Sequence, residues 1–157
     1  MRRSLPPVAS KVSDTLIARG HHGVIITQEN PTHTAQEAAD ALGVQLGAIT
    51  KSLLFLLDDD PVLLLVSGAH QVHLSRTGQR LEGTLTRAPA AMVPAVTGQP
   101  IGGVAPLGHP TNLPTFVDNA LSRHTELWAA GGHPNTLFRT TFGELVRITA
   151  GLAIDVD

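Results

Sequence analysis

The sequence contains no cysteine among its 157 residues. This absence excludes disulfide bonds, thiolate nucleophiles and cysteine-based metal sites, and it suits a reducing compartment, so we expect a cytoplasmic protein. Aromatic residues are also scarce, with four phenylalanines and one tryptophan. A nucleic-acid-binding surface built from several stacked rings is therefore not expected.

Long apolar runs are missing as well. The acidic segment Asp58–Pro61 divides the longest apolar region in two, so no segment is long enough to span a membrane. Residues Met1–Pro7 include two arginines but no apolar stretch follows them, which argues against a signal peptide. We expect no membrane partner.

Positive charge is limited. The chain has 11 lysines and arginines against 13 acidic residues, for a formal net charge of -2. A protein that gains its affinity by neutralising many phosphates would be more basic. Contact with a single-stranded end of a nucleic acid is still compatible with this charge.

Only two lysines are present, and Lys51 lies at the mouth of an apolar run that predicts a buried strand. Arginine is otherwise the preferred cation here, so a lysine at this place indicates a need for a compact point charge. Such a group can meet a developing negative charge or shift its pKa on burial. The alternative is a lysine that ends a strand in solvent.

Glycines and prolines alternate with small apolar residues in the segment Thr97–Pro110. Glycine allows a ligand to approach the backbone amides, while proline restricts the chain between them. Amides held in this way could bind an oxyanion or a ribose phosphate. The alternative is a purely structural turn.

A second small-residue turn, Trp128–Thr136, carries His133 directly after Gly131 and Gly132. Glycines can bring amides close to a ligand here, and the histidine can donate or accept near neutral pH. A loop histidine with satisfied hydrogen bonds is the alternative.

Periodicity, capping boxes and turn residues predict the following elements. Helices are expected at 8–19, at 34–42 with a capping box at Thr34–Glu37, near Leu121, and from Thr141 with a second capping box; 87–97 is helical apart from Pro94. Strands are expected at 24–27, 53–57, 62–66, 72–74, 115–118 and 127–129, around Phe138, and at 152–156, with a hairpin around Asp58–Pro61 and both its strands buried on both faces. Hairpins outnumber crossover units, which indicates a single α+β domain over 1–157 with a mixed sheet and a loose segment at 1–7.

Other catalytic motifs are absent. None of the eight histidines has the helical spacing with glutamate of a zinc hydrolase, and His70 and His73 would point to opposite faces of their predicted strand. The sequence has neither a Gly-x-Ser-x-Gly elbow nor a phosphate-binding loop, and prolines around Gly102-Gly103 prevent the helix of a dinucleotide site. We predict no metal and no cofactor.

Taken in order, five features of the chain resemble the YbaK/ProX family of aminoacyl-tRNA deacylases, which also occurs as the inserted editing domain of bacterial prolyl-tRNA synthetases. The similarity runs from about residue 10 to the end. The features are the capped helix at Thr34, Thr50–Leu53, Thr97-Gly98 with Gly102–Pro106, Val117-Asp118, and Ala130–Gly132 before a final capped helix.

This resemblance implies a compact domain with a mixed, partly barrelled sheet and flanking helices. It also implies hydrolysis of the ester that joins a wrongly attached small amino acid to a tRNA, most often tRNA(Pro), without a metal. The expected partners are the acceptor end of a mischarged tRNA and an aminoacyl-tRNA synthetase. Catalytic roles fall on Lys51, Gly102 and Gly103, and substrate-binding roles on Ser52, Pro106, Asp118, Gly131, Gly132 and His133.

The amino acid is left open by two departures from the family pattern. Cysteine-clearing members carry an acidic residue after the glycines, where this chain has Gly131–Thr136, and alanine-clearing members have asparagine in place of Ser52. A small substrate such as alanine or serine fits size exclusion. Two other functions are kept as alternatives: a tRNA- or synthetase-binding module without turnover, and a hydrolase of another small ester.

Overall fold

A long β-hairpin forms the centre of the sheet. Strands β2 (Ile49–Leu57) and β3 (Asp60–Ser67) pair antiparallel along their length. They are joined by Asp58 and Asp59, whose φ angles of 49° and 69° are those of a tight two-residue turn. The predicted hairpin is confirmed, although β2 begins early enough that Lys51 lies inside the strand and not at its mouth. The predicted burial of both hairpin strands is confirmed for β3 from Val62 onward, whereas most residues of β2 are only half-buried.

The computed structural model describes residues 5–157 and places eight strands in one mixed sheet. The order is β1-β7-β6-β2-β3-β5-β8, with β4 also beside β2. The other strands are β1 (Ile25–Thr27), β4 (Leu85–Arg87), β5 (Thr115–Asp118), β6 (Leu127–Ala130), β7 (Thr136–Thr140) and β8 (Leu152–Ile154). The pairs β2–β6, β3–β5 and β5–β8 are parallel. The α+β prediction is confirmed, but the sheet is not closed, because its end strands β1 and β8 do not pair.

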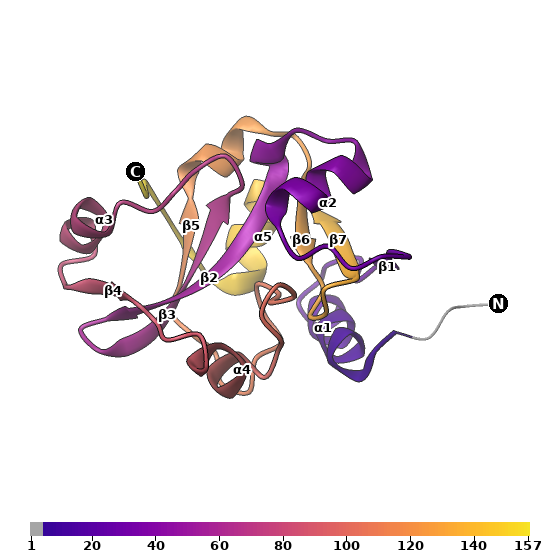
Figure 1. Cartoon of the computed structure of the whole chain (residues 1–157), viewed down its shortest axis with the longest axis horizontal. Helices are drawn as coiled ribbons and strands as arrows, with labels where there is room; N and C mark the ends of the chain where they lie inside the picture. The colour runs from indigo at the N-terminus through magenta and orange to yellow at the C-terminus, as the bar shows by residue number, and fades with distance from the viewer. Residues whose placement is uncertain (1–4) are drawn as a thin grey trace.

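In the described part of the chain, five α-helices flank the sheet: α1 (Pro7–Ala18), α2 (Ala35–Leu42), α3 (Leu74–Arg80), α4 (Met92–Thr97) and α5 (Phe142–Thr149). Both predicted threonine caps are present, because the Thr34 and Thr141 hydroxyls accept from the Glu37 and Glu144 amides at 3.1 and 3.2 Å. Helix α3 and strand β4 lie at one end of the molecule and β1 at the other (Figure 1). Part of the loose segment expected at 1–7, residues 1–4, lies outside the described residues, and α1 begins at Pro7.

Two predicted elements are wrong. The expected strand at 72–74 is the entry to helix α3, where the His73 ring accepts a hydrogen bond from the Arg76 amide and caps the helix. The expected helix at 87–97 is the end of β4 followed by a short α4. Pro94 is tolerated there because it lies in the first turn, where a missing N–H breaks no helical hydrogen bond.

Successive residues of β2 point to opposite faces of the sheet. Leu53 and Phe55 pack with Leu74 of α3, on one face. The other face of the hairpin packs against Leu145 of α5 and against Val104. Ser52 belongs to this second face, because it pairs with Leu65 of the same cluster. Between residues 5 and 157, no helix has the length and apolar character needed to cross a membrane.

Candidate functional site

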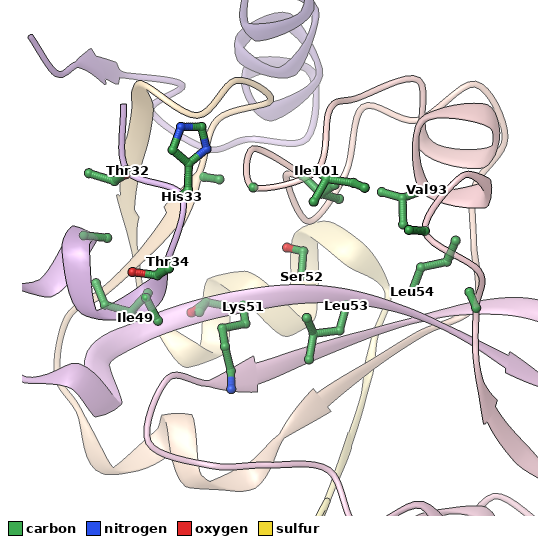
Figure 2. A pocket seen from close by; sticks show the side chains of 18 of the residues that line it. Thr32, His33, Thr34, Ile49, Lys51, Ser52, Leu53, Leu54, Val93 and Ile101 are labelled. Atoms are coloured by element: carbon green, nitrogen blue, oxygen red, sulfur yellow. The ribbon is translucent and has the colours of Figure 1, made fainter. Parts of the chain in front are cut away.

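A cavity of about 690 Å³ runs along β2. The start of α2, the region from β4 to α4 and the loop after α4 surround it. The side chains around it are mostly apolar, and Figure 2 shows Ser52 on the same side of β2 as Val93 and Ile101. Its lining residues are Thr32–Ala35, Ala38, Ile49–Phe55, Arg87, Ala88, Ala90, Val93, Ile101, Gly102, Val104, Ala130 and Leu137.

One edge of β2 is left open beside this cavity. On that edge β6 pairs only with Ile49 and Thr50, and β4 pairs only from Phe55 onward. The strands β4 and β6 are too short to meet, so no described strand covers the part of β2 between them. Ser52 lies in this gap.

The register shows which backbone groups face the gap. The Gly68 amide donates to the Ile49 carbonyl across the β2–β3 pair, and the Asp58 amide donates to Thr84 on the β4 side. In an antiparallel pair these directions alternate along the strand, so odd-numbered residues of β2 bond to β3 and even-numbered ones face the other edge. The N–H and C=O of Ser52 therefore point to the open edge, and no turn or loop hydrogen bond in residues 5–157 uses them.

Two hydroxyls on this part of β2 also lack partners. The side-chain oxygens of Thr50 and Ser52 are buried and make no hydrogen bond within the described residues. Buried polar atoms are nearly always paired in folded proteins. The unpaired groups thus gather at one place, on the wall of the cavity.

Lys51 extends from the other side of the strand (Figure 2). Its ammonium donates to the His70 carbonyl oxygen at 2.7 Å. Burial lowers the pKa of Lys51 below its ordinary value, and the nearby Asp118 carboxylate offsets part of this effect. Lys51 lines the cavity, but its ammonium lies away from Ser52. The side chains of these two predicted site residues therefore point to opposite faces of the sheet.

Asp118 is the centre of a buried polar cluster behind β2. It is 1% exposed and accepts from the amides of Ser67 and Ala120 at 3.1 and 2.9 Å. Its carboxylate also lies 3.0 Å from the His70 ring. Asp118 does not line the cavity, and it links Lys51 and the segment after β3 to the end of β5. His70 lies in a loop, and not in the strand expected for it.

The loop after α4 places Gly102 in the cavity wall but turns Gly103 inward. Gly102 has a φ of 85°, a conformation that glycine adopts without strain. The Gly103 amide donates to the Pro100 carbonyl at 3.0 Å, so it is already occupied. Buried Gln99 holds the loop in place, because its side chain accepts from the Ala105 amide at 2.7 Å and donates to the Leu107 carbonyl oxygen at 3.2 Å.

The second glycine turn packs beneath this loop. A Cβ on Gly103 would lie 2.6 Å from the backbone carbon of His133, so the two turns touch through backbone atoms. Gly132 has a φ of 104° and lies against Val12 of α1. The His133 ring contacts the Asn135 side chain at 2.6 Å. Gly131, Gly132 and His133 do not line the cavity and instead support its wall.

Pro106 lines a different hollow, of about 440 Å³, beside Arg19 and Arg147. Each of these arginines donates to a backbone carbonyl at the end of the other's helix, at 2.6 Å. Such bonds satisfy the unpaired carbonyls at helix C-termini. The hollow is thus explained by helix capping.

Sequence reasoning missed His33, Thr32 and Arg87 as cavity residues. His33 directly precedes the capping box, and this position at the start of a helix was an available signal. Arg87 is exposed at the end of β4, and none of the ion pairs in residues 5–157 involves it. In the same residues no group of histidines and acids is placed to hold a metal ion.

Comparison with known proteins identifies the family. Residues 29–148 match the model of the aminoacyl-tRNA editing domain, and the chain therefore belongs to that family. A crystal structure of a protein proposed as a trans-editing enzyme for prolyl tRNA synthetase has a TM-score of 0.91 and 39% identity, covering 98% of this chain and 99% of the other. The resemblance found in the sequence is thus confirmed.

Two relatives differ in how much of their length matches this chain. Uncharacterized protein YwhH of Bacillus subtilis (strain 168) is 30% identical over 118 residues, which is 74% of this chain and 75% of YwhH. The proline–tRNA ligase of Maridesulfovibrio salexigens is 31% identical over 102 residues, 64% of this chain. This chain spans only 17% of that ligase.

Proposed function

We propose that the chain hydrolyses the ester between a small, wrongly attached amino acid and the 3′ end of tRNA(Pro). The observation that carries this proposal is the cavity along β2, which joins apolar walls to unpaired polar groups within an aminoacyl-tRNA editing domain. The relatives named for prolyl-tRNA synthesis support tRNA(Pro) as the carrier. A synthetase is the expected protein partner.

The reaction needs little chemistry from the protein, because an aminoacyl ester is already reactive. Water adds to the ester carbonyl carbon, the carbonyl oxygen becomes an oxyanion, and the ribose oxygen leaves and takes a proton. Positioning the ester and stabilising the oxyanion are then the main tasks. The water can be activated by the substrate amine or by the neighbouring ribose hydroxyl.

Lys51 and Gly102 are assigned to these tasks. Gly102 supplies backbone on the cavity wall, and its amide donates no backbone hydrogen bond within residues 5–157. The ammonium of Lys51 contributes positive potential from behind β2 and positions the strand through its bond to His70. Gly103, His133 and Asp118 act through the groups they hold in place.

The test is the deacylation rate of tRNA(Pro) charged with alanine, serine, threonine, cysteine or proline. We expect one mischarged ester to be cleared faster than in buffer and the prolyl ester to survive. Lys51→Ala should slow that clearance, because it removes both the positive potential behind β2 and the bond to His70 that positions the strand. Lys11→Ala, which changes the other lysine at an exposed position of α1, is the matched control and should keep the wild-type rate.

Two outcomes would contradict the proposal. Binding of tRNA with no ester hydrolysed above the buffer rate would indicate a recognition module. Equal hydrolysis of simple amino acid ethyl esters and aminoacyl-tRNA would indicate a hydrolase for other small esters.

A further inference from the structure

The open edge of β2 is a short gap between two paired segments. It is closed at one end by the Thr50–Ala129 pair and at the other by the Phe55–Arg87 pair. By the alternation of the register, Ser52 and Leu54 direct their N–H and C=O groups outward within this gap. Leu54 adjoins the Phe55–Arg87 pair, so Ser52 is the outward-facing residue with no strand pair next to it on the β4 side. A ligand that pairs with Ser52 alone is about as long as one amino acid.

An aminoacyl ester has the same order of groups as one residue of a strand: a nitrogen donor, an α-carbon and a carbonyl acceptor. Two residues in a hydrogen-bonded antiparallel pair exchange both N–H···O bonds. We propose that the aminoacyl group of the substrate binds the open edge of β2 as a one-residue strand. Its α-ammonium donates to the Ser52 carbonyl oxygen, and its ester carbonyl oxygen accepts from the Ser52 N–H. This inference rests on the proposed function and adds how the substrate is recognised.

The composition of the cavity supports this pairing. None of its lining residues is an aspartate or glutamate, so the substrate ammonium meets no carboxylate there. A buried cation needs hydrogen-bond acceptors, and the Ser52 carbonyl supplies one. Small side chains of the substrate then face apolar walls formed by residues such as Leu54 and Val93.

The same contact serves the reaction. The Ser52 N–H faces the ester oxygen that becomes negative when water adds to the carbonyl carbon. As the ribose oxygen leaves, the oxyanion returns to a carbonyl and remains bonded to the same N–H. A donor fixed in a strand costs no reorganisation during this step.

Strand pairing also discriminates against proline. The proline ring places a methylene beside the nitrogen, in place of one hydrogen of a primary ammonium, and fixes the directions of the two remaining hydrogens. The methylene then crowds the Ser52 carbonyl oxygen, so the cognate prolyl ester should pair with this edge less well than a primary amine does. A cyclic imino acid smaller than proline should be disfavoured too.

A matched pair of substrates tests this. We compare kcat/KM for tRNA(Pro) charged with 2-aminobutyrate and with azetidine-2-carboxylate, which have the same number of carbon atoms, each corrected for hydrolysis in buffer. The primary amine should be favoured by at least about tenfold. Alanyl-tRNA should exceed lactyl-tRNA by a similar factor, because a hydroxyl replaces the ammonium.

Ser52→Ala keeps the backbone groups and removes only the hydroxyl. Whatever its absolute rate, the ratio between the two matched substrates should stay within about twofold of wild type. A ratio that collapses would assign the selection to the side chain and overturn the inference. Equal rates for the two substrates in the wild-type protein would also overturn it, while leaving the proposed function intact. If no mischarged ester is hydrolysed, the proposed function itself fails.

Discussion

Substitution of Gly103 by alanine probes the contact that holds the cavity wall in place. The added Cβ would lie 2.6 Å from the His133 carbonyl carbon and 2.7 Å from the Pro134 nitrogen. Both are backbone atoms, so no side chain can rotate away, and one of the two turns must move. Overpacking of this kind costs about 3 kcal/mol, at the upper end of the usual range.

For a chain of this length, each kcal/mol changes the melting temperature by about 2–4 °C, so Gly103→Ala should lower it by about 6–12 °C. Gly143→Ala is the matched control, because nothing lies within 4 Å of its added Cβ. Alanine is the better helix former, and this variant should melt at or slightly above the wild-type temperature. Calorimetry of the three proteins in one buffer measures both shifts.

The reasoning would be refuted by a Gly103→Ala protein that melts within about 2 °C of wild type. Such a result would mean that the two turns are not in rigid backbone contact. A loss of deacylation with normal melting would instead return Gly103 to the catalytic role first predicted for it.

Three further predictions concern the cavity, its loop and pH. Arg87 lines the cavity, is exposed and makes no ion pair within residues 5–157, so we expect it to contact a tRNA phosphate. Arg87→Gln should then lower kcat/KM for aminoacyl-tRNA about tenfold, while Arg76→Gln on α3 should not; single-turnover kinetics measures both. Gln99→Leu should cost about 2–3 kcal/mol in urea unfolding, because it leaves two buried loop groups unpaired. Burial lowers the pKa of His21 and His109 below 6.5. The unfolded chain then binds more protons than the folded chain below pH 6.5. The urea midpoint should therefore decrease as the pH is lowered below 6.5. This decrease should be smaller in a variant with both histidines changed to glutamine.

Features with local signals could be predicted from the sequence. The threonine caps at Thr34 and Thr141 depend on residues three positions apart, and the hairpin depends on two apolar runs and an acidic turn. The entry to α3 was misread because His73 is an unusual cap. Lys51, Ser52 and Gly102 were predicted as site residues from the family resemblance, and all three line the cavity. Nothing in the order of residues 51 and 52 shows that their side chains point to opposite faces.

The sequence by itself determined the family, the α+β class and most of the elements, because these follow from short-range patterns and from motifs in order. Only the tertiary structure decided which groups are left without partners. The open edge at Ser52 exists because β4 and β6, far apart in the sequence, both end before they meet along β2. Likewise, Gly103 is constrained by a turn thirty residues later. Register and contacts of this kind depend on how distant segments pack, which local propensity does not encode.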